Sequence, residues 1–137
     1  MTKAIPTIQK YMTTTPQTVG KGQTLAHAMK MMDEVHARHL PVLDGGTLVG
    51  VISERDIAMV QNLAGSNPEA LKVEDAMSQN PYTVAPDASL DVVAQEMADK
   101  KYGSAVVMQN HKVVGIFTAV DGLAALAELL HTRLGVR

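Results

Sequence analysis

Hydrophobic and polar positions along the chain change their spacing in a regular order. Thr18-Val19 is predicted to form a very short strand. From Leu25 onwards, apolar residues recur every three or four positions, which predicts an amphipathic helix. Thr24 stands directly before this stretch and is a suitable helix N-cap. The apolar positions of the expected helix are Leu25, Ala28, Met29, Met32 and Val35.

Two apolar runs then follow, and a turn separates them. His39 to Leu43 and Thr47 to Ser53 are predicted strands, and Asp44-Gly45-Gly46 between them is a hairpin signal. Residues 54 to 63 return to helical spacing, with Ile57, Val60 and Ala64 apolar. The first half of the chain therefore predicts the order β-α-β-β-α.

The second half repeats this order. Short-strand, helix and hairpin patterns recur at Thr83-Val84, at 90–97 behind the N-cap candidate Ser89, and at 104–108 with 112–118. A last helix is expected from about 120 to 132, and residues 64–68 read as the connector. The apolar positions of the helix in this half are Leu90, Val93, Ala94 and Met97.

A shift of 65 residues aligns the chain with itself without a gap. Ten of the 45 positions from 12 to 56 are then identical, including Met12 with Met77 and Asp56 with Asp121. Such a register predicts two copies of one supersecondary unit. The hairpin strands are apolar nearly throughout, which favours strands covered on both faces. We therefore expect an α/β (α+β) fold, in which the two copies pack sheet against sheet with pseudo-twofold symmetry.

Met-x-x-x-Pro opens a copy, His39-Leu40-Pro41-Val42 precedes the turn, and Leu-Val-Gly-Val-Ile-Ser-x-x-Asp closes the hairpin. With these elements in this order, each copy resembles a CBS motif. The second copy departs from the first at Ala105-Val106, where the first has Leu40-Pro41. The resemblance implies CBS motifs at 8–63 and 73–126, together forming one Bateman module.

A hydroxyl and a carboxylate stand three residues apart at the end of each hairpin. Ser53 with Asp56, and Thr118 with Asp121, fit a helix-capping box, which is a purely structural explanation. The family resemblance implies a second role: the Asp accepts hydrogen bonds from both ribose hydroxyls of an adenosyl ligand. A carboxylate suits a diol because it only accepts hydrogen bonds. The two roles are compatible.

Basic residues differ between the copies. The first copy carries Arg38, His39 and Arg55, where the second has Gly103, Ser104 and Val120. The resemblance implies that Asp121 and Thr118 face Arg38, His39 and Arg55 from the partner copy, so that this site prefers phosphorylated adenosine. Two alternatives stay open: Arg38 reaches Asp56 of its own copy, or both arginines are solvated surface residues.

The adenine is expected in an apolar slot beside the short strands. Gln17 to Val19 would line one site and Tyr82 to Val84 the other, by the same resemblance. His36-x-x-His39 has a spacing that could bind a metal, but it straddles the expected end of a helix and no carboxylate or Cys completes the set. We therefore predict no metal site.

Composition narrows the function classes. The net charge of −2 gives no reason to expect a nucleic acid or an anionic membrane as partner. The chain has no Cys, no Gly-rich phosphate loop and no nucleophile paired with a base. No apolar run reaches the ~20 residues of a membrane span. These features predict a cytoplasmic, non-catalytic protein that requires no cofactor.

The function expected from the resemblance is regulatory. The module would sense AMP, ADP or ATP, with S-adenosylmethionine or NADH as alternatives, and act through an unidentified target protein. Surplus apolar positions on the helices predict a homodimer. A ligand-free dimerisation module is the competing interpretation. The apolar positions in question are Ile57, Val60, Leu63, Leu123, Leu126, Leu129 and Leu130.

Overall fold

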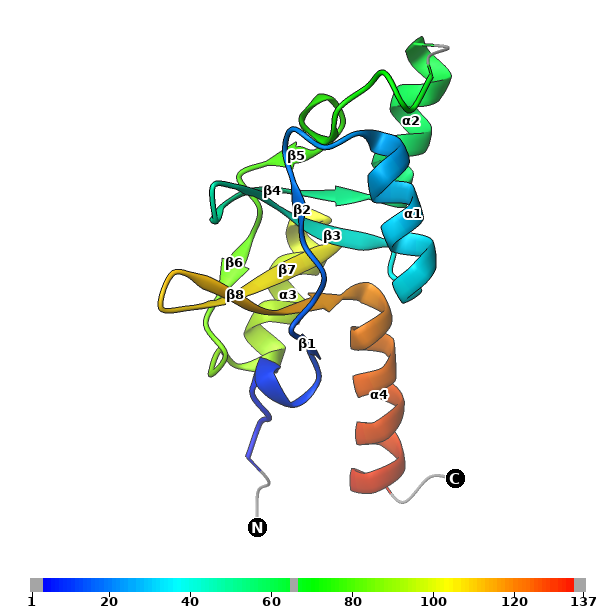
Figure 1. The fold of residues 1–137 in the computed structure, drawn as a ribbon. Helices are drawn as coiled ribbons and strands as arrows, with labels where there is room; N and C mark the ends of the chain where they lie inside the picture. The colour runs from blue at the N-terminus through cyan, green and yellow to red at the C-terminus, as the bar shows by residue number, and fades with distance from the viewer. Residues whose placement is uncertain (1–3, 65–66, 135–137) are drawn as a thin grey trace. The chain divides into compact units, whose positions relative to one another are not determined.

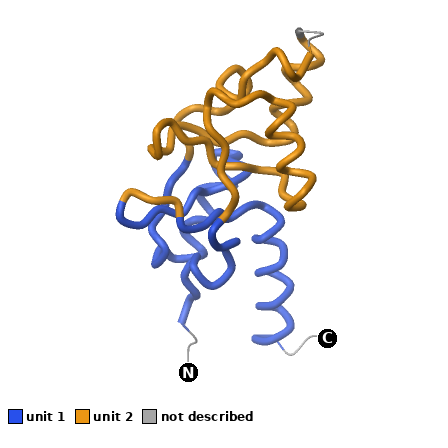
Figure 2. The backbone as a smooth tube through the Cα atoms, in the orientation of Figure 1, with its two compact units in different colours: residues 1–15, 82–110, 114–137 blue, residues 16–81, 111–113 orange. Residues whose placement is uncertain are grey.

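A computed structural model describes residues 4–64 and 67–134 of the chain. The chain divides into two compact units, shown in different colours in Figure 2. Unit 1 comprises residues 1–15, 82–110 and 114–137, and unit 2 comprises residues 16–81 and 111–113. Each unit is built around its own sheet and its own apolar core.

Unit 2 contains a four-stranded mixed sheet in the order β2-β3-β4-β5, with two helices (Figure 1). The short strand β2 runs parallel to β3, whereas β3-β4 and β4-β5 are antiparallel. Its elements are β2 (Val19–Gly20), α1 (Leu25–Val35), β3 (His39–Asp44), β4 (Thr47–Ser53), α2 (Glu54–Ala64), the 3-10 helix η2 (Val73–Asp75) and β5 (Ser78–Gln79).

Unit 1 repeats this plan with the strand order β1-β8-β7-β6 (Figure 1). Strand β6 is parallel to β7, and β1 is antiparallel to β8. Its elements are η1 (Ile8–Lys10), β1 (Thr13–Thr14), β6 (Thr83–Val84), α3 (Leu90–Lys100), β7 (Ser104–Gln109), β8 (Lys112–Thr118) and α4 (Ala119–Arg133). The α+β class and the predicted element order of both copies are confirmed. Sheet-against-sheet packing of the copies stays a prediction.

Two short strands were not expected from the sequence. Strand β1 pairs Thr13 with Ile116 and Thr14 with Gly115, so the segment that opens the first copy completes the sheet of the second. Strand β5 plays the matching part in unit 2, where Ser78 pairs with Val51. Both strands span only two residues, too few for a recognisable alternation of apolar and polar positions.

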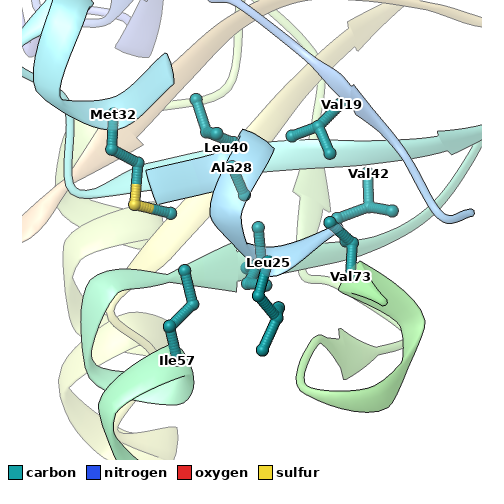
Figure 3. Packing of buried hydrophobic residues seen from close by; sticks show 9 residues of the cluster. Val19, Leu25, Ala28, Met32, Leu40, Val42, Ile57 and Val73 are labelled. Carbon is teal, nitrogen blue, oxygen red and sulfur yellow. The ribbon is translucent and has the colours of Figure 1, made fainter. Parts of the chain in front are cut away.

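The core of unit 2 lies between its sheet and its helices. Leu25, Ala28 and Met32 of α1 are buried there, together with Val19 of β2 and Ile57 of α2 (Figure 3). The predicted apolar face of α1 was too wide, because Met29 and Val35 are exposed. Three turns of helix bring only one narrow stripe of side chains against a sheet.

The homodimer expectation counted some core residues as surplus. Ile57 is buried in unit 2, where Val60 packs against the same core, and Leu129 packs against the core of unit 1. Leu63 of α2 is exposed, and so are Leu123, Leu126 and Leu130 of α4. The sequence shows which helix positions are apolar, but burial depends on what each helix packs against.

Glycines in the long strands make room for the methionines of the Met-x-x-x-Pro segments. A Cβ at Gly50 would lie 2.6 Å from the backbone oxygen of Ser78 and 2.8 Å from Met77 Sδ. A Cβ at Gly115 would overlap Met12 Sδ, and its three nearest atoms all belong to the Met12 side chain. Each long strand therefore has a Gly where a methionine of a Met-x-x-x-Pro segment packs against it, 27 positions away for Gly50 and 103 for Gly115.

The two predicted N-caps differ in their contacts. Thr24 caps α1 as expected, since its Oγ1 accepts a hydrogen bond from the His27 N–H at 3.1 Å. Ser89 occupies the N-cap position of α3 but makes no side-chain cap bond. Its hydroxyl donates to Asp91 instead, so the predicted cap interaction at Ser89 was wrong.

Candidate functional site

A carboxylate closes on the backbone where β4 ends and α2 begins. Asp56 Oδ2 accepts a hydrogen bond from the Ser53 N–H at 2.9 Å, and Ser53 Oγ accepts one from the Asp56 N–H at 3.0 Å. This is a reciprocal capping arrangement, and both residues are partly buried. Capping bonds hold this carboxylate in place at a helix N-terminus, where the positive ends of the backbone dipoles favour anions.

The start of α4 repeats this arrangement in unit 1. Asp121 Oδ2 accepts bonds from the N–H and the Oγ1 of Thr118 at 3.0 and 3.3 Å, and Thr118 Oγ1 faces the Asp121 N–H at 3.4 Å. A third residue also contacts this carboxylate: Thr13 Oγ1 lies 3.5 Å from Asp121 Oδ1. Both pairs therefore make the capping bonds that their spacing predicts, and a ligand role for the same carboxylates stays a prediction.

Basic residues gather in sequence and in space around the start of α2. The Arg38 carbonyl accepts a hydrogen bond from the Glu54 N–H at 2.9 Å, and His39 pairs with Ser53 across the hairpin. Arg55 stands in the first turn of α2, and both arginines are exposed. Unit 2 alone thus brings Arg38, His39 and Arg55 to the end of the hairpin that carries Ser53 and Asp56.

The matching position in unit 1 has the same backbone but no cation. The Gly103 carbonyl accepts the Ala119 N–H at 3.3 Å, as Arg38 does with Glu54. Ser104 is buried, and Val120 is 66% exposed. The difference in charge that the sequence predicted therefore falls on equivalent backbone positions.

The residues predicted to line an adenine slot lie at the short strands. Val19 is buried in the core of unit 2 and pairs with Val42, while Gln17 precedes it and is exposed. In unit 1, Val84 is partly buried against the core. Because Val19 belongs to the core, its backbone and not its side chain is the part available to a ligand.

Tyr82 lies beside a second aromatic ring. Its ring centroid is 5.3 Å from that of Tyr102, with the planes inclined by 31°. Burial raises the pKa of Tyr82, and the charges of Glu96 and Tyr102 raise it further. Tyr82 is therefore a neutral phenol at physiological pH, with a face already partly occupied by Tyr102.

The described residues contain no group of three or more His, Cys, Asp or Glu that could hold a metal ion. His36 is the C-cap of α1 in a left-handed conformation, and His39 already belongs to β3. No helix in the described part of the chain combines the length and apolarity that a bilayer crossing needs.

Thr13 is the residue near a candidate carboxylate that the sequence did not single out. Its contact with Asp121 spans 108 positions. It depends on β1 joining the sheet of the second copy, for which no local spacing is a signal. The alignment of the two copies pairs Thr13 with Ser78, and the structure places both residues on edge strands.

Comparison with known proteins places these features in a family. The CBS domain family matches the chain twice, over residues 8–62 and 73–128. The uncharacterized protein YlbB of Bacillus subtilis is 36% identical over 110 residues, which cover 79% of this chain and 72% of YlbB. An inosine-5'-monophosphate dehydrogenase of Korarchaeum cryptofilum is 30% identical over 122 residues, but this chain spans only 24% of that enzyme.

A solved structure extends the likeness to the fold. The CBS domain pair of protein MJ0100, in complex with 5'-methylthioadenosine and S-adenosyl-L-methionine, superposes with a TM-score of 0.78. It is 26% identical, and the match covers 91% of this chain and 98% of that one. With two family matches in one register and a matching structure over nearly its whole length, the chain belongs to the CBS domain family and carries two copies of the domain.

Proposed function

We propose that this chain is a regulatory module that binds an adenosyl ligand, with AMP, ADP or ATP as the preferred class. The observation that carries the proposal is the repeated carboxylate, Asp56 and Asp121, at a helix N-terminus in each unit. The complex of the related MJ0100 domain pair with 5'-methylthioadenosine and S-adenosyl-L-methionine supports an adenosyl group as the shared part of the ligand.

The chemistry of the site fits a ribose and a phosphate. The capping bonds engage only one oxygen of each carboxylate, so capping by itself leaves acceptor capacity for ribose hydroxyls. The helix N-terminus beside it favours a phosphate. Ser53 and Thr118 contribute hydroxyls next to the same carboxylates, and Gln17, Val19, Tyr82 and Val84 are the proposed neighbours of the adenine.

The phosphate preference is proposed to come from the basic residues of unit 2. Arg38, His39 and Arg55 stand at the end of the hairpin that carries Asp56, within the same unit. The sequence left open whether these cations face Asp121 of the other copy or Asp56 of their own copy. We favour the second arrangement, in which they bind the phosphate of a ligand at Asp56. Arginine offers a planar fork that matches phosphate oxygens. Unit 1 offers no cation at the equivalent positions Gly103, Ser104 and Val120.

Titration calorimetry with AMP, ATP, S-adenosylmethionine and NADH tests the proposal. We expect at least one of the four to bind with a Kd below the millimolar range, and the phosphorylated adenosines to bind best. Failure of all four ligands to bind to protein freed of bound small molecules would favour the ligand-free alternative.

Removing the two arginines is expected to weaken the binding of AMP but not that of adenosine. The Arg38→Ala/Arg55→Ala protein should bind AMP about tenfold more weakly, since it loses charged hydrogen bonds to the phosphate, while adenosine binding stays unchanged. Calorimetry with both ligands measures the two affinities. Lys30→Ala/Lys100→Ala removes the same charge from exposed positions on α1 and α3 and is the matched control. Equal AMP affinity in the arginine variant and in this control would contradict the assignment.

The regulatory part of the proposal concerns output. A ligand shifts a conformational equilibrium only as far as it prefers one state, so the response must be passed to a partner protein that distinguishes the two states. We propose that the module acts in the cytoplasm on such a target and performs no chemistry of its own. Its recurrence within a much longer dehydrogenase supports a role as a module that accompanies other functions.

The competing function is dimerisation without a ligand, and the surface of α4 supports dimerisation itself. Leu123, Leu126 and Leu130 are 67%, 53% and 40% exposed along one helix. Exposed apolar side chains that gather in this way are typical of a protein interface. A dimer and a ligand site are compatible, so the surface bears on both functions.

We predict a homodimer in solution that depends on these leucines. Leu123→Asp should shift the protein from dimer to monomer at micromolar concentration, because the charge would be buried without a partner. Sedimentation equilibrium gives the mass directly. Val92→Asp, at a residue 62% exposed on α3 of the same unit, should leave the dimer intact. A wild-type protein that sediments as a monomer would contradict the prediction.

A further inference from the structure

The two repeated carboxylates differ in a contact from the edge strand of their unit. In unit 1, Thr13 on β1 donates its hydroxyl to Asp121 Oδ1 at 3.5 Å. The equivalent residue in unit 2 is Ser78 on β5, which occupies the same place in the sheet. Among the described residues, Ser78 makes no hydrogen bond to Asp56.

This contact changes how much of each carboxylate a ligand can use. Both oxygens of Asp121 already have a protein donor, Oδ2 through Thr118 and Oδ1 through Thr13. For Asp56, the backbone N–H of Ser53 engages Oδ2, and within the described residues Oδ1 has no protein donor. A ribose diol donates two hydrogen bonds, so at Asp121 it must share or displace the Thr13 hydroxyl.

Competition of this kind is weak but measurable. The Thr13 contact is long and solvent-exposed, so a ligand can displace it. A hydrogen bond to a charged group nevertheless contributes more than one between neutral groups. The difference acts on the ribose end of a ligand. It is therefore separate from the cations of unit 2, which act on the phosphate end.

We propose that Thr13 is a specificity-determining residue: its hydroxyl competes with the ribose for Asp121, so that an adenosyl ligand fills the Asp56 site first. This inference rests on the proposed function, since it concerns the same ligand class. It assigns to the edge strands β1 and β5 a role in ranking the two sites. The hydroxyl of Thr13 on β1 contacts Asp121, whereas among the described residues that of Ser78 on β5 does not contact Asp56.

Neutral adenosine is the probe that tests this, because it removes the contribution of the phosphate. Asp56→Asn leaves only the Asp121 carboxylate, and Asp121→Asn leaves only Asp56. We expect adenosine to bind the Asp121→Asn protein more tightly than the Asp56→Asn protein in calorimetry. Adding Thr13→Val to Asp56→Asn should raise its affinity for adenosine about threefold or more. Valine keeps the β-branched shape that suits a strand.

Two controls identify the hydroxyl as the cause. Thr13→Ser in the Asp56→Asn background keeps the donor and should bind as the parent does. Ser78→Ala in the Asp121→Asn background removes a hydroxyl that makes no contact with Asp56, and should change nothing. If the Thr13→Val protein does not fold, Thr13→Ala also lacks the hydroxyl and takes its place.

The possible results separate the inference from the function it rests on. Adenosine affinity that is unchanged or lower after loss of the Thr13 hydroxyl overturns the competition, and a lower affinity would make Thr13 a ligand-binding residue. If no variant and not even the wild-type protein binds adenosine, AMP or S-adenosylmethionine, the proposed function itself fails and the inference fails with it.

Discussion

Gly50→Ala is expected to destabilise the protein by about 2–3 kcal/mol, the upper part of the roughly 1–3 kcal/mol typical of an extra methyl group forced into a packed site. The new Cβ would lie 2.6 Å from the Ser78 backbone oxygen and 2.8 Å from Met77 Sδ. The Ser78 oxygen belongs to strand β5, so relief requires β5 to move away from β4 and to weaken their pairing at Gly50 and Val51.

The equivalent change in unit 1 should cost less. At Gly115 the three nearest atoms to a new Cβ all belong to the flexible side chain of Met12, which can change rotamer. Chemical denaturation of the two variants beside the wild type measures the difference. Gly115→Ala is the matched control, and equal loss of stability in both would show that the backbone of β5 yields as readily as a methionine side chain.

The second large effect expected is on ligand affinity. Asp56→Asn/Asp121→Asn should weaken adenine-nucleotide binding at least about tenfold, because charged hydrogen bonds to the ribose contribute roughly 1.5–3 kcal/mol. Asparagine keeps one carbonyl oxygen for the capping bonds from Ser53 and Thr118, so the melting temperature should fall only slightly.

Ser53→Ala/Thr118→Ala should have the opposite effect, a larger loss of stability than of ligand affinity. These changes remove the hydroxyls that accept bonds from the Asp56 and Asp121 N–H groups, and loss of such a cap typically costs about 1 kcal/mol per helix. Melting curves and calorimetry on the same samples compare the two effects. If the Asn variant loses stability and affinity in equal measure, the carboxylates act mainly as helix caps.

Local patterns were sufficient to predict most of the fold. The hairpins at 39–53 and 104–118, and the helices that follow them, match strong turn and spacing signals. The 65-residue repeat predicted the second copy from the first. Strand β2 starts at Val19, one residue later than predicted, which is an ordinary uncertainty at the end of an element.

What the sequence could not predict depends on contacts between distant segments. The pairing of β1 with β8 joins residues about 100 positions apart, and the contact of Thr13 with Asp121 follows from it. Burial of Ile57 and Leu129 depends on the sheet each helix covers, and is not a property of the helix alone. Local spacing cannot encode either, because both arise in tertiary packing.

The candidate carboxylates are a different case. Their spacing from Ser53 and Thr118 predicts a capping box, which the structure contains at both helix starts. The ligand role came from the resemblance to CBS motifs and stays a prediction. Capping and ribose binding use the same side chain, and ligand affinity measured beside stability separates the two roles.

Native mass spectrometry of the purified protein tests the central proposal most directly. The spectrum shows a protein and its bound ligands together, both for molecules that copurify and for AMP or ATP added afterwards. We predict masses for one and then two adenine nucleotides per chain, with both adducts lost in Asp56→Asn/Asp121→Asn. A wild-type protein that carries no adenosyl ligand and takes up neither AMP, ATP nor S-adenosylmethionine would contradict the account.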